Sequence, residues 1–200
     1  SLDAKQTSSH IAFIYEPTNK FTNKITYGNT YIERIVPETP NSGNSGGADT
    51  YYGDRYTLMY TGNYKFNLDN SIAFGIERED DQLGYNKDMA GRKDKAAYVS
   101  SSYFDVQNRV TNNMYVTYGA RLDKHSVAGR ETSHRATAAY LFDNKSTKLK
   151  SSYGTGFRFP SVYEQYFLNS YNPNLTAESS RGYDFGVEKS FSNLGLTLDA

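Results

Sequence analysis

A strict alternation of apolar and polar residues is the feature that most limits what this chain can fold into. Between positions 114 and 123, Met, Val, Tyr, Ala and Leu fall on one side, and Tyr, Thr, Gly, Arg and Asp fall on the other. The same alternation recurs near residues 72–77, 149–158 and 182–188. A helix, with its period of 3.6, would mix the two sets, so the pattern predicts β-strands with one apolar face and one polar, glycine-bearing face.

Taken along the whole chain, the alternation predicts an all-β fold, an antiparallel meander of about ten strands. A short turn of helix is compatible with segment 161–168, and no other helix is expected. The expected strands lie near residues 7–16, 23–35, 53–66, 70–79, 95–106, 112–123, 131–142, 146–158, 181–190 and 194–200.

The connectors between these strands alternate in length. Short turns fall near 67–70, 107–112, 143–146 and 192–193, whereas long polar stretches occupy 37–50, 79–94 and 159–180, with a shorter one at 123–130. Transmembrane β-barrels combine tight periplasmic turns with long extracellular loops. This alternation of short and long connectors favours a membrane barrel. A soluble β-sandwich binding module remains the alternative. A sandwich would pack the Tyr118 and Phe185 faces together as a dry core.

Composition supports the barrel and excludes several other classes of protein. The 200 residues include 19 Tyr and 11 Phe but no Trp, and the mean hydropathy is −0.73. Aromatic residues at the two interfaces are typical of outer-membrane barrels. The 22 basic and 22 acidic residues cancel, which argues against nucleic acid as a partner. The absence of cysteine excludes thiol and zinc-finger chemistry.

The most distinctive motif is Tyr-Gly-Thr-Gly-Phe-Arg-Phe-Pro-Ser at 153–161. It is followed by Asn-Pro-Asn-Leu at 172–175 and by the strand Gly-Tyr-Asp-Phe-Gly-Val-Glu at 182–188. These motifs resemble the barrel of TonB-dependent outer-membrane receptors, and are most similar to the vitamin B12 and ferric-siderophore receptors. The resemblance is closest over residues 146–190, and Ala177 departs from it where many relatives carry proline.

The resemblance implies that residues 1–200 are a partial β-barrel domain, part of a 22-stranded transmembrane barrel in the bacterial outer membrane, without the plug and the remaining strands. It implies TonB-dependent uptake of a scarce ligand, cobalamin or a ferric siderophore, with no enzyme activity and no cofactor. The implied partners are outer-membrane lipid and lipopolysaccharide, the TonB complex through the plug, and the small-molecule ligand. A passive outer-membrane barrel or an adhesin is a further alternative.

The candidate residues for facing the ligand or the plug cluster in and after the motif. Arg158 is expected to point inward at the end of a strand, where its guanidinium could hold a carboxylate such as Glu178. Inward-facing glycines at 154 and 156 would allow close approach of a plug. No catalytic residue and no metal site is predicted. The candidates are Arg158, Glu164, Tyr166, Tyr171, Asn172, Asn174 and Glu178.

Three other constellations have a functional and a structural interpretation. An acidic segment at 77–94 could supply oxygen ligands to Ca²⁺, although a solvated charged loop is favoured. His125 and His134 could ligate haem, although ordinary surface histidines are favoured. Tyrosines 51, 52 and 56 are interpreted as interfacial girdle residues, whereas tyrosines 163, 166 and 171 could either contact ligand or belong to a girdle.

Overall fold

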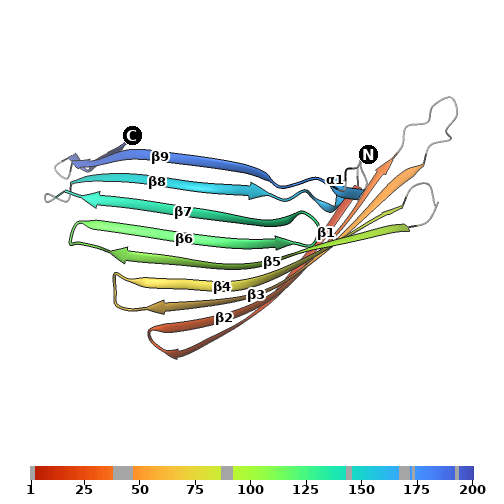
Figure 1. Cartoon of the computed structure of the whole chain (residues 1–200), viewed down its shortest axis with the longest axis horizontal. Coiled ribbons are helices and arrows are strands. Elements are labelled where there is room, and N and C mark those ends of the chain that lie inside the picture. The colour runs from red at the N-terminus through yellow and green to blue at the C-terminus, as the bar shows by residue number, and fades with distance from the viewer. Residues whose placement is uncertain are drawn as a thin grey trace.

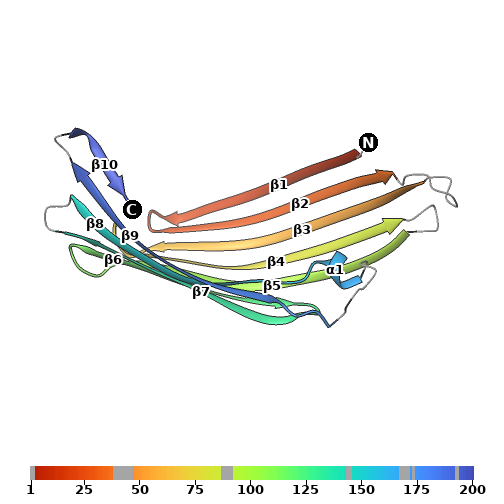
Figure 2. The same ribbon diagram turned by 90° about the horizontal axis from the view of Figure 1, so that it is seen from above.

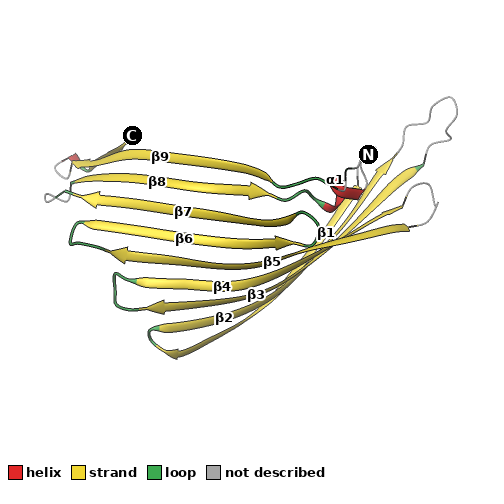
Figure 3. Ribbon diagram, in the orientation of Figure 1, coloured by secondary structure: helices red, strands yellow, loops and turns green. Residues whose placement is uncertain are grey.

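The chain forms one ten-stranded antiparallel sheet in which every strand pairs with its neighbours in sequence (Figures 1 and 3). The computed structural model describes residues 3–37, 47–86, 92–142, 146–166, 172, 174–191 and 194–200. The strands are β1 (Asp3–Thr18), β2 (Phe21–Pro37), β3 (Ala48–Lys65), β4 (Ser71–Asn86), β5 (Arg92–Arg109), β6 (Met114–His125), β7 (Gly129–Leu141), β8 (Thr147–Arg158), β9 (Glu178–Phe191) and β10 (Leu196–Asp199), with the short helix α1 (Val162–Tyr166) between β8 and β9.

The predicted meander and the predicted helical turn near 161–168 are both confirmed. The long loop predicted at 79–94 is wrong, because β4 runs on to Asn86 and β5 already begins at Arg92. The acidic residues of this segment do not end the strand, since the ladder continues through pairs such as Glu79 with Val99 and Asp81 with Ala97. The part of that prediction at 87–91 lies outside the described residues.

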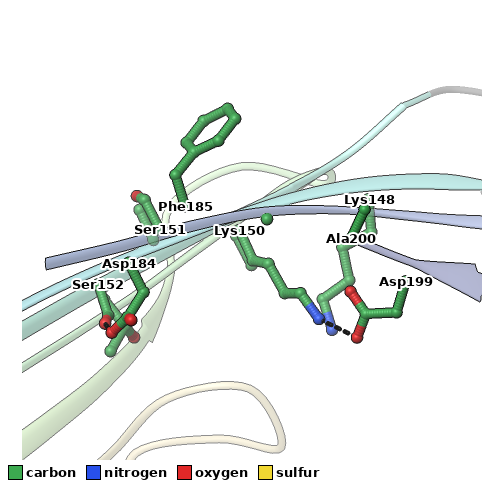
Figure 4. Close-up of a pocket in the computed structure, with 12 residues that line it drawn as sticks. Lys148, Lys150, Ser151, Ser152, Asp184, Phe185, Asp199 and Ala200 are labelled. Carbon is green, nitrogen blue, oxygen red and sulfur yellow. Dashed lines mark hydrogen bonds and ion pairs between the residues drawn. The ribbon is translucent and has the colours of Figure 1, made fainter.

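The sheet is curved like a trough, with α1 on its concave side (Figure 2). Strand register places Gly119, Arg135, Gly154 and Gly182 in one row across β6 to β9, on the polar face. Figure 4 shows the alternation directly: the Phe185 side chain leaves the sheet on the opposite side from Lys150 and Asp184. The predicted separation into an apolar and a polar face is therefore confirmed.

No other described segment of the protein packs against the apolar convex face. Tyr118 is 42% exposed and Phe185 is 70% exposed, and Ala97 and Val162 are the buried hydrophobic residues of the described part. The dry core that a β-sandwich would need is therefore missing from the described residues, and the sandwich interpretation is wrong. Aromatic rings gather on this face near the short turns, where Phe21, Tyr64 and Phe66 meet edge to face at 5.1 to 6.2 Å.

The strands differ in length, and the longer ones extend further on one side of the sheet. β2 to β5 contain 16 to 18 residues, whereas β6 to β8 contain 12 or 13. The longer strands exceed the shorter ones by three to six residues, which is roughly 10 to 20 Å at about 3.4 Å per residue. Their extra length is on the side of the long connectors. No helix among the described residues is both long and apolar enough to cross a membrane.

Gly75 is needed on the concave face because Tyr103 of β5 lies across it. A Cβ atom on Gly75 would collide with the carbonyl oxygen of Tyr60 and approach the Tyr103 ring to 2.6 Å. The Tyr103 hydroxyl is also fixed by a 2.9 Å hydrogen bond with Thr61. A side chain at Gly75 would therefore displace both a strand and a ring.

We expect Gly75→Val to lower the free energy of unfolding by about 1–3 kcal/mol, the usual cost of overpacking. Urea-induced unfolding in lipid vesicles would measure it. Gly182→Val is the matched control, because an added Cβ there meets no atom within 4 Å. Equal destabilisation by the two variants would show that the Tyr103 contact is not the cause.

We expect the convex face to contact lipid. A charged substitution at Tyr118, which lies on this face, tests that expectation. Tyr118→Arg should cost about 2–4 kcal/mol of unfolding free energy in vesicles, because the charge would enter hydrocarbon. Thr117→Arg is the control, since Thr117 is the adjacent residue on the concave face and pairs there with Thr137. If the two arginines cost the same in vesicles, the convex face does not face lipid.

Candidate ligand-binding site

The connector after β8 folds back over the concave face as the helix α1. Its first turn is closed by a capping box, in which Ser161 Oγ accepts a hydrogen bond from the Glu164 N–H at 3.2 Å. The Glu164 carboxylate in turn accepts from the Ser161 N–H at 2.7 Å and from its hydroxyl at 2.9 Å. This reciprocal pair satisfies donors that a five-residue helix would otherwise leave free.

Arg158, the last residue of β8, ties this helix to the start of β9. Its guanidinium donates to both oxygens of Glu164 at 3.1 and 3.2 Å, and to both oxygens of Glu178 at 3.1 and 3.3 Å. The Arg158 hydrogen bonds, followed by those from Ser161, lower the pKa of Glu164 to about 2. We call Arg158, Glu164 and Glu178 the Arg158 clasp.

The face of α1 that meets the sheet is formed by Val162 and Gln165, and both are buried. Helix α1 contacts β4 and β5. The connector that follows the short strand β8 therefore packs against two of the longer strands. Gln165 is fully buried, yet neither its amide nitrogen nor its oxygen has a hydrogen-bond partner among the described residues. An unpaired buried amide destabilises the docked position of α1. The hydrogen bonds of the Arg158 clasp offset that cost.

Two arginines of the inner wall, Arg55 and Arg121, are already paired with carboxylates. Arg55 on β3 binds both oxygens of Asp81 at 2.7 and 2.8 Å, and approaches Glu79 to 3.4 Å. Arg121 on β6 holds Asp123 at 2.9 Å and Glu77 at 3.2 Å. Within the described ranges, no group of three or more His, Asp or Glu side chains could hold a metal ion. The Ca²⁺ interpretation of this acidic segment gains no support from this wall.

The two histidines considered for haem lie on opposite faces of the sheet. His125 ends β6 on the concave face, where its Nδ1 accepts hydrogen bonds from the N–H groups of Val127 and Ala128 at 3.1 and 3.0 Å. His134 points to the convex face and bonds the Tyr118 hydroxyl at 3.0 Å. A shared haem is therefore excluded, and His125 instead shapes the β6–β7 turn.

An aromatic cavity lies on the inner wall beyond α1, at the ends of β2 to β4. Tyr51 stacks on Tyr85 with ring centroids 4.9 Å apart, and Tyr163 of α1 meets Tyr51 edge-on at 6.1 Å. The cavity, about 480 Å³, is lined by these two tyrosines, 51 and 163, together with Ile32, Arg34, Val36, Tyr52, Gly53 and Leu83. Arg34 has no carboxylate partner among the described residues, so the cavity carries one free cation.

The girdle interpretation of Tyr51 is wrong, because its ring packs against α1 on the concave side. The signal that could have found the cavity was the alternation itself. Continued past Gly53 to Tyr51, it places Tyr51 on the same face as Arg55, and the register then brings Arg34 and Tyr85 beside it. The true length of β3 was hidden because its first residues are polar.

The predicted site residues separate into three groups. Arg158, Glu164 and Glu178 come together in the clasp, and the Tyr166 ring lies 5.1 Å from the Lys95 ammonium. Asn172 and Asn174 form a local turn instead, in which the Asn172 side chain accepts from the Asn174 N–H at 2.9 Å. Tyr171 lies outside the described residues.

A second cavity on the polar face lies near the short-turn end of β8 and β9 (Figure 4). It encloses about 440 Å³ and is bounded by a 2.6 Å contact between Lys150 and Asp199. Ser152 donates to Asp184 at 2.8 Å on its other side. Its two carboxylates, Asp184 and Asp199, are both paired within the sheet, and it lies at the other end of β8 from the clasp.

A tall antiparallel sheet with an apolar convex face and a polar, loop-covered concave face defines a segment of transmembrane β-barrel wall. Residues 2–200 match the family model of the TonB-dependent receptor-like β-barrel, and the chain belongs to that family. The family consists of receptors and transporters of the outer membrane of Gram-negative bacteria, so the predicted family and location are confirmed.

Solved structures share the fold at low sequence identity. The ferric enterobactin receptor PfeA of Pseudomonas aeruginosa superposes with a TM-score of 0.78 at 13% identity, covering 94% of this chain and 32% of its own. The siderophore receptor PirA of Acinetobacter baumannii gives 0.74 at 16% identity, covering 94% and 33%. The copper transporter OprC gives 0.73 at 14% identity, covering 94% and 37%. The chain thus spans about a third of the length of these structures.

Because the clasp depends on a charged Glu164, we expect the docking of α1 against the sheet to weaken at low pH. Because the pKa of Glu164 is lowered to about 2 from 4.5, the charged carboxylate stabilises the docked helix. That contribution is complete above pH 4.5 and is lost as the pH falls toward about 2. A spin label on Tyr166→Cys, the only cysteine in the labelled chain, should become more mobile over this range.

The control for this experiment is Glu164→Gln in the same labelled chain. It should be more mobile already at pH 7 and should respond little to acid. A label whose mobility in the Glu164 protein is unchanged between pH 7 and pH 2 would contradict the role of the clasp.

Proposed function

We propose that the protein takes up a ferric siderophore in a TonB-dependent way. The observation that carries the proposal is the cavity formed by Tyr51, Tyr163 and Arg34, for which the described residues supply no carboxylate partner. Aromatic faces stack on flat aryl groups, and a free guanidinium attracts a negatively charged chelate. Family membership and the two siderophore receptors among the similar structures support the same conclusion.

Cobalamin, the other ligand suggested by the sequence motifs, is the less supported choice. The similar structures include siderophore receptors and a copper transporter. A cavity of about 480 Å³ with one free cation suits an anionic metal chelate bearing aryl groups. A passive barrel would not need a loop held over its inner wall by an ion-pair cluster.

The remaining parts of the proposal concern the whole receptor. Residues 1–200 would form part of a larger barrel domain, closed by further strands and filled by a plug that receives work from TonB. The inward glycines at 154 and 182 leave a low strip of wall against which a plug could lie; a Cβ on either meets no atom closer than 3.5 Å. Outer-membrane lipid and lipopolysaccharide would surround the convex face.

Within this proposal, the predicted site residues take different roles. The Arg158 clasp positions α1, and α1 presents Tyr163 to the cavity. Tyr166 and Lys95 would steady the far end of the helix. The Asn172 turn would shape the return to β9. The clasp is thus a positioning device, and direct contact with the ligand falls to Tyr163 and Arg34.

The test is uptake of radiolabelled ferric enterobactin, as a tricatecholate probe, by cells producing the protein. Tyr163→Ala and Arg34→Gln should each weaken binding about tenfold, the effect of losing roughly 1.4 kcal/mol. Tyr183→Ala is the control, since Tyr183 is 85% exposed on the convex face. Cyanocobalamin serves as the competing substrate.

Two outcomes would contradict the proposal at different levels. Uptake of the ferric probe that neither Tyr163→Ala nor Arg34→Gln affects would reject the cavity as its binding site. Uptake of cyanocobalamin, with no uptake of ferric tricatecholate, tris-hydroxamate or citrate probes, would reject the ligand class.

A further inference from the structure

A row of cations crosses the convex face just above the apolar band. Register aligns Arg78 on β4, Ser100 on β5, Lys124 on β6 and Arg130 on β7 across four adjacent strands. Strands lie about 4.8 Å apart, so the row is about 15 Å long. Lys124 and Arg130 are exposed, whereas their neighbours Asp123 and His125 are buried on the opposite face. We call Arg78, Lys124 and Arg130 the cation row.

The position of the row coincides with the end of the apolar band. On β4 the convex residues are Ile72, Phe74 and Ile76 before Arg78, and on β6 the apolar convex residues run from Met114 to Leu122 before Lys124. Nine residues from 114 to 122 are about what a tilted strand needs to cross the hydrocarbon. The row is on the long-connector side, so it lies at the level of the outer-leaflet headgroups.

Two of the three cations in the row, Lys124 and Arg130, have no balancing carboxylate in the described part of the protein. Arg78 is held by Asp80 at 2.9 and 3.0 Å, and its guanidinium lies 3.4 Å from the centre of the Tyr98 ring. Lys124 and Arg130 sit directly opposite each other, and neither has a carboxylate partner among the described residues. Like charges paired across strands destabilise a sheet. An anion bound between them would remove that repulsion.

The chemistry around the row selects the kind of anion. One donor comes from an ammonium and others from planar guanidinium groups, a set that matches phosphate oxygens. Apolar Leu122 lies on the membrane side of Lys124 and is 46% exposed, so an acyl chain could lie against it while the headgroup meets the cations. A free phosphate would gain nothing from that apolar surface.

We propose that the cation row binds the phosphate of a phosphorylated glycolipid of the outer leaflet, with the acyl chains of the lipid against the apolar band below. Lys124 and Arg130 make the principal contacts. Arg78, already fixed by Asp80 and Tyr98, supplies a rigid third donor at one end. The site faces lipid and is on the opposite face of the sheet from the ligand cavity.

The proposal is tested on the protein purified from outer membranes, by native mass spectrometry with added diphosphoryl lipid A. The double variant Lys124→Gln/Arg130→Gln should retain lipid A at least about tenfold less than the unaltered protein, because each such cation contributes about fivefold near an anionic surface. The matched control is Lys20→Gln/Lys65→Gln, which removes two charges at the short-turn end and should retain lipid A normally.

A second comparison needs no variant and so does not depend on folding of the mutants. The unaltered protein should bind diphosphoryl lipid A at least about tenfold more tightly than its dephosphorylated analogue, since the phosphate contacts would be absent from the analogue. Inorganic phosphate at millimolar concentration should compete poorly, because it lacks the acyl contact. Equal binding of the two lipids, or equal retention by the two double variants, would overturn the proposal, and displacement by inorganic phosphate would assign the row to free phosphate instead.

Discussion

Satisfaction of backbone hydrogen bonds is the constraint on which the rest of this structure depends. A chain that lies in lipid cannot leave N–H and C=O groups unpaired, and the ladder from β1 to β10 gives each interior strand a hydrogen-bonded neighbour on both sides. Once the ladder is fixed, side chains can point only to the convex or to the concave face. The apolar band, the paired charges of the wall and the cation row are all consequences of that two-way choice.

Helix α1 illustrates how a loop is added to such a wall. It buries little apolar surface, with Val162 against the sheet and an unpaired Gln165 beside it. Its position instead rests on charge-assisted hydrogen bonds from Arg158, which are exposed to water and therefore weak individually. The docking of α1 thus depends on side-chain hydrogen bonds and not on the backbone ladder of the strands that carry it.

The sequence was sufficient to predict the fold but only part of the site. Alternation in segments such as 114–123 predicted the strand number, the meander and both faces, and the motif at 153–161 indicated the family. The pairing of Arg158 with Glu178 was also anticipated. The first five residues of β3, 48–52, and the upper part of β4, 80–86, were missed because polar residues there, such as Asp80 and Asp81, resemble a solvated loop. The arginines that pair with carboxylates of β4, Arg55 and Arg121, come from strands distant in sequence, and only the register shows which carboxylate each one meets.

Alternation could have placed Tyr51 on the concave face, but it could not show the whole cavity, because Tyr163 comes from α1, a third segment. Tyr51, Tyr85 and Tyr163 are separated by 34 and 78 residues, and no local pattern connects them. The girdle interpretation of Tyr51 failed for the same reason: a tyrosine near a strand end is compatible with lipid or with lumen until the depth of the band is known.

Because the strands differ in length, the local stability of this wall is expected to differ between its upper and lower parts. Where β2 to β5 rise above β6 to β8, lipid no longer presses on the outer face, and the raised part is supported by its own ladder and by pairs such as Arg55 with Asp81. Such a margin opens locally at lower free energy than the lipid-supported zone beneath it. The upper rim is therefore the part of this wall with the lower expected local stability, and the part beneath it the more rigid one.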